Sequence, residues 1–362
     1  MHKDSKFNIL KYFDLLRLFV AVGIALLITT VIIFMVSENP MKALGTLLTG
    51  PISSKRYFFN VLEMMVPLMF TGLSISLVFK SGNFSMITDA SFYIGAVIAS
   101  AVAIMIPLPS GIHPMVAIVI AGFIGGIIGS IPAWCKVKYK ANELVTSLML
   151  NYVFFYTGLY IVNKFLIDRQ ASNFASLKFL KSASLSNIVE GTRLHSGFII
   201  AIVTCILLFI FLTRTKWGYE IRIVGSNQEF ARYSGINTKK VILYTSFISG
   251  FVAAMGGAIE KLGMYRRFQW SMAPSYAWDG VIISILSSNN PIFVPVAAFF
   301  LSYIRVGADI MARQTDVQNE IVSLIQGVII LLVTAERFLY FIKQRKESQL
   351  ALANNENKGG DK

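Results

Sequence analysis

A short polar segment, residues 217–236, interrupts an otherwise apolar part of the sequence. Apolar stretches long enough to cross a bilayer flank it on both sides. Ser226 and Glu229 have the spacing of a capping box, in which two side chains bind backbone N–H groups at a helix start. Gly235 stands where a left-handed residue would end that helix. The segment therefore predicts a short, rigid helix at the membrane surface, suited to receive force from a soluble partner.

Carboxylic acids inside the apolar segments form a second group of candidates. Ionisable side chains in a membrane are costly and usually face a cavity or a partner. Asp89 and Asp279 each lie beside an expected helix break, where unwound backbone and side chain can together bind a polar solute. Glu63 is a lone carboxyl within its segment, and it is either protonated, paired or in contact with solute. These acids predict a solute pathway.

Polar side chains extend this candidate pathway. Asn151 lies within an apolar segment and needs a hydrogen-bond partner, so it serves either as a link between helices or as a solute contact. Glu260 differs, because Lys261 and the arginines at 266 and 267 can neutralise it at the membrane interface. The candidate pathway residues are Glu63, Asn83, Ser85, Asp89, Asn151, Asp279, Asn289 and Asn290.

The sequence lacks the common catalytic and metal-binding motifs. The three histidines are isolated, and the two cysteines, Cys135 and Cys205, are far apart. It contains no H-E-x-x-H, C-x-x-C or G-x-S-x-G pattern, and no phosphate-binding G-x-x-x-x-G-K-[ST] loop. We therefore expect no enzymatic activity, no metal and no cofactor bound by this chain. Any dependence on ATP must come from another subunit.

The composition is that of a membrane protein. Of the 362 residues, 55% are hydrophobic and only 14% are charged, whereas a soluble domain carries about 25% charged residues. The net charge of +14 fits an excess of lysine and arginine on cytoplasmic loops and attraction to anionic lipid. Nucleic-acid binding is not expected, because no compact basic domain is present.

Ten apolar segments are expected to span the membrane, with both termini in the cytoplasm. They cover about residues 17–36, 57–79, 86–106, 114–134, 143–163, 196–213, 241–262, 277–287, 292–308 and 320–336. The membrane domain is thus expected over residues 17–341, with the segment 214–240 in the cytoplasm. Residues 1–16 and 342–362 form cytoplasmic tails, and the second is expected to be disordered.

A faint internal repeat predicts how the spans are arranged. The spans at 57–79 and 241–262 each run into a polar stretch that is followed by another apolar piece. With five spans per unit, the two copies would be inverted and would have broken helices at matching positions. The expected fold is an all-α polytopic membrane protein of about ten transmembrane helices, with two inverted repeats. Small residues spaced four apart in 114–134 and 241–262 predict close helix packing.

Several short motifs, in order from about residue 60 to residue 335, resemble one family. The polar segment supplies Gly225-x-Asn227-x-x-x-Ala231-x-x-x-Gly235-Ile236. The other motifs are Thr71–Leu73, Phe79–Gly82, Asn142–Tyr152, Ser249–Gly250, Gly256–Glu260, Asp279–Val281, Asn289–Pro291 and Gln326–Gly327. Together they resemble the permeases of bacterial ABC importers of the branched-chain amino acid and simple-sugar type, most of all the nucleoside branch.

The resemblance implies the partners of the chain. It implies a multi-pass permease of the bacterial cytoplasmic membrane that imports nucleoside. The permease would pair with a second permease or with a second copy of itself. An ATPase would bind ATP and Mg, a solute-binding lipoprotein would deliver cargo from outside, and membrane lipid would surround the chain. In the family, the cytoplasmic coupling segment docks in a groove of the ATPase. By position, this role falls on Gly225, Ser226, Asn227, Glu229, Ala231, Arg232, Tyr233 and Gly235.

One departure from the family keeps the cargo open. After Phe-Lys-Ser-Gly, the family usually reads Asn-Ile-Gly-x-Glu-Gly-Gln, whereas residues 85–91 read Ser-Met-Ile-Thr-Asp-Ala-Ser. Simple sugar and riboflavin-type cargo are therefore alternatives to nucleoside. An ion-coupled secondary transporter is the alternative class, since it too uses broken helices and acids at mid-membrane. Its transport would need no ATPase and would collapse with the ion gradient.

Overall fold

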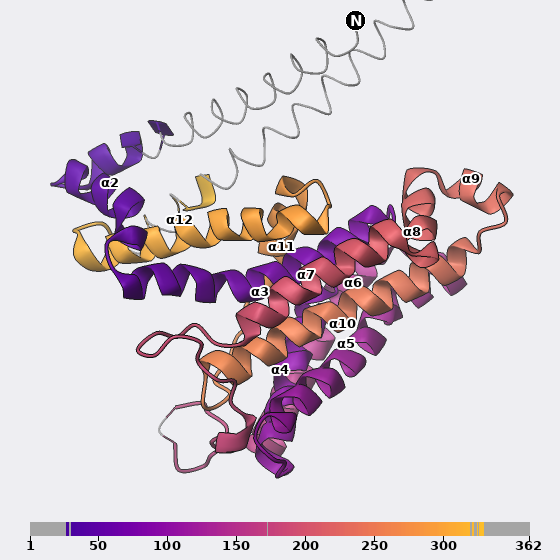
Figure 1. The fold of residues 1–362 in the computed structure, drawn as a ribbon, viewed down its shortest axis with the longest axis horizontal. Coiled ribbons are helices and arrows are strands. Elements are labelled where there is room, and N and C mark those ends of the chain that lie inside the picture. The colour runs from indigo at the N-terminus through magenta and orange to yellow at the C-terminus, as the bar shows by residue number, and fades with distance from the viewer. Residues whose placement is uncertain are drawn as a thin grey trace, which may run out of the picture. The chain divides into compact units, whose positions relative to one another are not determined.

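The computed structural model describes residues 27–318 apart from 29 and 172, together with 321, 324 and 326–328. The regular secondary structure of these residues is helical, apart from two isolated β-bridges. Figure 1 shows this arrangement. The long helices are α3 (Lys55–Lys80), α4 (Thr88–Met105), α5 (Ile112–Tyr139), α6 (Glu143–Ile161), α7 (Gly197–Arg214), α10 (Thr238–Met264) and α12 (Val294–Gln314).

The remaining elements are short. They are α2 (Pro40–Thr49), α8 (Lys216–Ser226), α9 (Gln228–Tyr233), α11 (Tyr276–Leu286), three 3-10 turns, η1 (Gly50–Ile52), η3 (Lys181–Ala183) and η4 (Pro291–Phe293), and the π-helical turn η2 (Val162–Leu166), which extends α6.

Seven helices among the described residues are long and apolar enough to cross a membrane. They correspond to seven of the ten expected spans, with bounds that differ by a few residues. The expected span at 277–287 is α11, which has only 11 residues and is shorter than the roughly 20 that a bilayer core requires. The spans expected at 17–36 and 320–336 lie mostly outside the described residues, so the count of ten is not confirmed.

The chain divides into two compact units, residues 1–51 with 304–362, and residues 52–303. In the first unit, α2 packs against the second half of α12, where a Cβ on Gly307 would overlap the backbone of Leu47. Ser37 Oγ donates a hydrogen bond to Asp316 Oδ1 at 2.7 Å. This bond, together with one from a backbone N–H, holds the pKa of Asp316 below its usual range.

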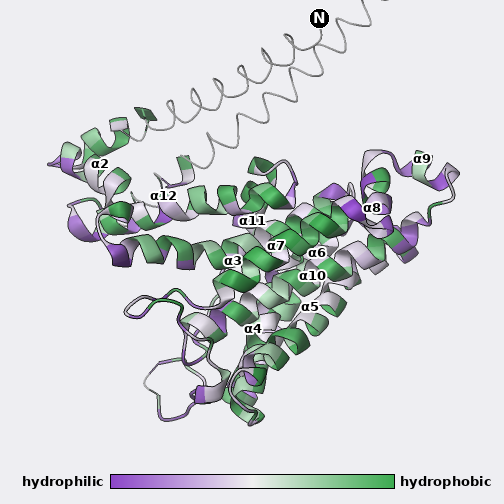
Figure 2. Cartoon of the chain, viewed as in Figure 1, coloured by the Kyte–Doolittle hydropathy of each residue, from purple (hydrophilic) through white to green (hydrophobic). Residues whose placement is uncertain are grey.

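The core of the second unit is built around α10, which packs against α3, α4 and α5. Small residues make this possible. Gly125 and Gly129 of α5 face Gly250 and Ala254 of α10, and a Cβ on any of the three glycines would overlap the opposite helix. The close packing expected from the small-residue pattern is thus confirmed. Figure 2 shows the long helices as mostly hydrophobic, whereas α8 and α9 carry hydrophilic stretches.

The helix pairs α3–α4 and α10–α11 pack in a reciprocal manner. Gly280 of α11 approaches the backbone of Thr71 in α3, and Gly257 of α10 approaches the backbone of Phe92 in α4. Each short partner therefore lies on the long helix of the other pair. Two inverted copies would produce this exchange, although the repeat itself stays a prediction.

Candidate functional site

The polar segment between α7 and α10 folds into α8 and α9. Asn227 Oδ1 accepts a hydrogen bond from the backbone N of Phe230 at 2.9 Å and caps α9. The predicted capping box is therefore wrong. Ser226 is the last residue of α8, and Glu229 forms an ion pair with Arg232 at 3.3 Å instead. The prediction failed because asparagine caps helices as well as serine does, and Asn227 follows Ser226 directly.

The end of α9 agrees with the prediction. Gly235 has a φ of +82°, and the N–H of Ile236 donates to the carbonyl of Ala231 at 3.0 Å, as in a left-handed helix stop. Two aromatic side chains on α9 face solvent, with exposures of 58% for Phe230 and 89% for Tyr233. The segment therefore presents a small apolar surface held by a capped helix.

The polar segment contacts the end of α3 through backbone atoms. A Cβ on Gly225 would overlap the carbonyl oxygen of Lys80. Gly82, with a φ of +72°, lies against the same glycine, whose Cα is 3.1 Å from the place that a Cβ on Gly82 would take. Displacement of α8 and α9 would consequently be transmitted to the break that follows α3.

Side chains from three further segments meet at this end of the helices. Lys136, near the end of α5, donates to the side chain of Asn83 and forms an ion pair with Glu143 Oε2 at 2.9 Å. Glu143 begins α6 and is buried. Asn83, expected in the pathway, is thus bound to the α5–α6 connection.

A cavity of about 570 Å³ lies between α4, α6 and residues 271–278. Asp89 and Asn151, two of the residues expected to line a pathway, both line it. Much of the remaining wall is aromatic and consists of Tyr93, Tyr152, Phe155, Tyr156 and Trp278. The cavity thus combines a carboxyl group with several ring faces.

Asp89 and Asn151 also hold the broken helices in place. Asp89 Oδ1 accepts a hydrogen bond from the backbone N of Ala277 at 2.9 Å, at the start of α11. Asn151 Nδ2 donates to the carbonyl of Met86 at 2.9 Å, and its Oδ1 accepts from the N of Ala90 at 3.2 Å. Asn151 therefore links α6 to the start of α4, which is one of its two expected roles. Its place on the cavity wall is also compatible with the other role, contact with solute.

The other expected pathway residues are distributed over the protein. Asp279 is buried and interacts electrostatically with Asp89. Ser85 is buried, and its hydroxyl has no hydrogen-bond partner among the described residues. Glu63 is buried close enough to Glu260 and to Arg193 for electrostatic interaction. None of these three lines the cavity described above.

Asn289 and Asn290 shape a turn. Asn289 Oδ1 accepts from Ser284 Oγ at 2.8 Å, and its φ is +55°. Asn290 Oδ1 accepts from the N of Ile292 at 3.3 Å and caps η4. Both amides thus serve the connection between α11 and α12.

Sequence reasoning missed the aromatic wall. Tyr152 and Tyr156 are one helical turn apart on α6 and so share a face, which was a readable signal. Trp278 belongs to a segment that meets α6 only in the folded protein. Lys261 was expected only as a charge near Glu260 at the membrane interface, and its aromatic surroundings were missed. It is fully buried, as is Glu260, and its Nζ lies 3.4 Å from the ring centroid of Trp270 and 4.0 Å from that of Tyr265. Such cation–π contacts stabilise a buried ammonium group.

These features define a polytopic membrane protein with a polar-lined cavity and an exposed helix between two spans. Residues 57–334 match the model of the family described as branched-chain amino acid transport system / permease component, and the chain belongs to that family. It is a permease.

Curated relatives agree with this assignment. The chain is 28% identical to a guanosine ABC transporter permease of Bacillus subtilis over 79% of this chain and 83% of the relative. It is 28% identical to a glucose ABC transporter permease of Haloferax volcanii over 87% and 86%. It is 24% identical to a nucleoside ABC transporter permease of Lactococcus lactis over 95% and 96%. No solved structure matches the chain.

Proposed function

We propose that this permease imports a nucleoside across the bacterial cytoplasmic membrane, driven by ATP hydrolysis in a partner subunit. The cavity carries this proposal. Aromatic faces stack well on nucleobases, and Tyr152, Tyr156 and Trp278 offer such faces beside Asp89. The nucleoside and guanosine relatives support the same cargo. Glucose, the cargo in the name of the Haloferax volcanii relative, and riboflavin are the alternative cargoes.

The partner ATPase would act on the permease through α9. The exposed Phe230 and Tyr233 are suited to a groove on the ATPase, which would hold ATP and Mg in its own subunit. Closure of the ATPase would push α9 and, through the backbone contact between Gly225 and Lys80, the end of α3. A second permease subunit and an extracellular binding lipoprotein complete the assembly, and both chain termini lie in the cytoplasm.

Uptake of labelled guanosine by cells that express the complete transporter tests the cargo. We expect Trp278→Ala to lower the uptake rate about tenfold, because loss of one stacked ring costs about 1–3 kcal/mol per base. Tyr160→Ala is the matched control, since Tyr160 is 57% exposed on α6 and does not line the cavity. No saturable uptake of labelled guanosine, together with uptake of labelled glucose or riboflavin by the same cells, would replace the proposed cargo.

A further inference from the structure

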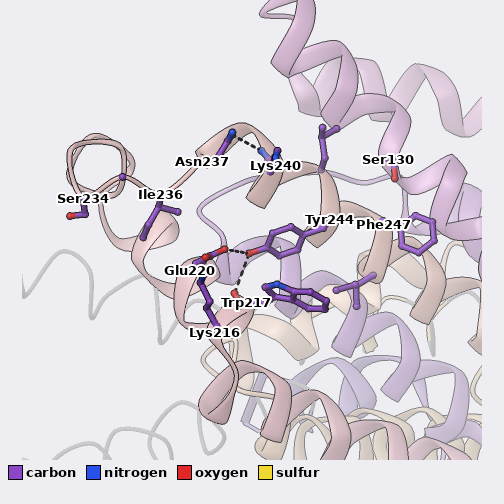
Figure 3. Close-up of a pocket in the computed structure, with 13 residues that line it drawn as sticks. Ser130, Lys216, Trp217, Glu220, Ser234, Ile236, Asn237, Lys240, Tyr244 and Phe247 are labelled. Atoms are coloured by element: carbon purple, nitrogen blue, oxygen red, sulfur yellow. Dashed lines mark hydrogen bonds between the residues drawn. The ribbon is translucent and has the colours of Figure 1, made fainter.

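We call residues 216–237 the coupling segment. A second cavity, of about 1000 Å³, is lined in part by this segment. Figure 3 shows its lining, which comes from α8, from the turn after α9 and from the first three turns of α10, with Ser130 of α5. The predicted pathway residues do not line this cavity. It is therefore separate from the cavity between α4 and α6.

The two ends of this cavity differ in chemistry. Lys216, at the start of α8, and Lys240, in the first turn of α10, line one end of it, and both are exposed. Leu243, Phe247 and Ile248 line it further along α10. Because a helix rises about 1.5 Å per residue, Phe247 lies roughly 10 Å beyond Lys240 along the axis. The cavity thus has a cationic mouth and an apolar depth.

Glu220, the acidic side chain in the lining, is hydrogen-bonded to another side chain of the cavity wall. Glu220 Oε2 accepts a hydrogen bond from the hydroxyl of Tyr244 at 3.2 Å, and the same hydroxyl lies 3.2 Å from the carbonyl oxygen of Trp217. The Trp217 ring is 6.2 Å from the Tyr244 ring and is 60% exposed. Tryptophan and tyrosine rings favour the level of lipid headgroups. Lys216 and Lys240 outnumber the one acidic side chain in the lining, which leaves a net positive charge at the level that these rings favour.

We propose that this cavity binds one anionic phospholipid. The headgroup phosphate would lie between Lys216 and Lys240, and an acyl chain would follow Leu243, Phe247 and Ile248 into the membrane. Basic pockets between helices on the cytoplasmic side favour anionic headgroups, and here the apolar depth selects a lipid over a free phosphate. A bound lipid would support the coupling segment from behind, against Ser234 and Ile236.

Fluorescence of Trp217 in the full-length protein tests the site. The purified chain is placed in vesicles of phosphatidylcholine that contain a small fraction of brominated phosphatidylglycerol or, separately, brominated phosphatidylcholine. Bromine on the acyl chain quenches a nearby indole, and subtraction of the Trp217→Phe variant isolates the signal of this residue. We expect stronger quenching by the brominated anionic lipid. This readout needs neither cargo nor ATPase, so it can fail without affecting the proposed function.

A matched pair of charge variants separates a defined site from general surface attraction. Lys216→Gln with Lys240→Gln removes both cavity lysines, and we expect the preference for the anionic lipid to fall about tenfold or more. Arg222→Gln with Lys239→Gln removes the same charge from exposed residues outside the lining, and the preference should persist. Equal loss in both pairs, or equal quenching by the two lipids in the unaltered protein, would overturn the proposal. Unchanged elution and helical circular dichroism establish that the variants are folded.

Discussion

Gly225 joins two parts of the protein that are far apart in sequence. Its missing side chain lets α8 rest on the carbonyl of Lys80, and the space left there is smaller than a methyl group. Gly235 has a different reason to be glycine. Its φ of +82° is a conformation that L side chains rarely adopt, yet nothing lies within 4 Å of the place that a Cβ would take. One glycine is required for contact and the other for backbone conformation.

This difference gives a prediction for two variants. We expect Gly225→Ala to displace α8, to destabilise the protein by about 1–3 kcal/mol as overpacking does, and to lower uptake at normal expression. Gly235→Asn should be tolerated, because asparagine adopts left-handed backbone more readily than other residues. Uptake and thermal stability, measured together, check both. Normal uptake by Gly225→Ala would exclude the tight contact with Lys80.

His195 is a buried histidine just before α7. Its Nδ1 accepts a hydrogen bond from the N of Gly197 at 3.2 Å, and its ring packs beside Gly263. Burial lowers the pKa of His195 to about 4, below the ordinary value of about 6.5. The folded state thus binds fewer protons than the unfolded state between these two values, so stability rises with pH across this window and is fully present above about pH 6.5.

The His195 pKa predicts acid sensitivity. Stability should decline as the pH falls from about 6.5 to about 4, with a contribution of about 3 kcal/mol at the limit. His195→Gln keeps a hydrogen-bond acceptor but does not titrate in this range. We expect its thermal midpoint in detergent to change less than that of the unaltered protein between about pH 7.5 and pH 5. An identical pH response in both proteins would contradict a buried neutral histidine.

At the level of elements, hydropathy located the long helices well. Seven apolar segments coincide with α3, α4, α5, α6, α7, α10 and α12, because each must satisfy its own backbone within the bilayer. The polar break after α3 and the stop at Gly235 were also readable from local residue types. The start of α9 was misplaced, since Ser226 and Asn227 compete as caps and the extent of α8 decides between them.

The candidate sites were less predictable than the helices. Asp89 and Asn151 could be selected because polar groups are rare in spans, but their shared cavity arises from the packing of α4, α6 and residues 271–278. The aromatic wall and the contact between Gly225 and Lys80 likewise depend on residues far apart in sequence. A single sequence shows which residue types are available for such sites. Only the folded structure shows which of these residues lie close together.

The seam between α5 and α10 gives a prediction at this scale. Gly125 lies against the backbone of Gly250 and the side chain of Ala254, so a large side chain would force the helices apart. We expect Gly125→Leu to cost about 1–3 kcal/mol or more and to reduce the yield of folded protein. Val119→Leu on the same helix is the control, because Val119 is 58% exposed. Size-exclusion profiles after mild heating would compare them, and equal profiles would contradict a tight seam.

At the level of the whole molecule, the ends of α10 separate two polar regions. Its first turn follows the coupling segment, while near its last turn the carbonyl of Leu262 accepts a hydrogen bond from the N of Leu185, in the loop between α6 and α7. With 27 residues, α10 is roughly 40 Å long, about the full thickness of a bilayer. This length predicts that the coupling segment and the loop 167–195 face opposite sides of the membrane.

Thiol labelling in a background with Cys135→Ser and Cys205→Ala tests this orientation. Tyr233→Cys places a thiol on α9, and Glu190→Cys places one in the exposed loop. An impermeant maleimide should label Glu190→Cys in intact cells and Tyr233→Cys only after permeabilisation, because α9, as the proposed contact for the ATPase, would face the cytoplasm. The cysteine-free protein should remain unlabelled. Labelling of Tyr233→Cys in intact cells would reverse the topology and, with it, remove α9 as the point where ATP hydrolysis drives transport.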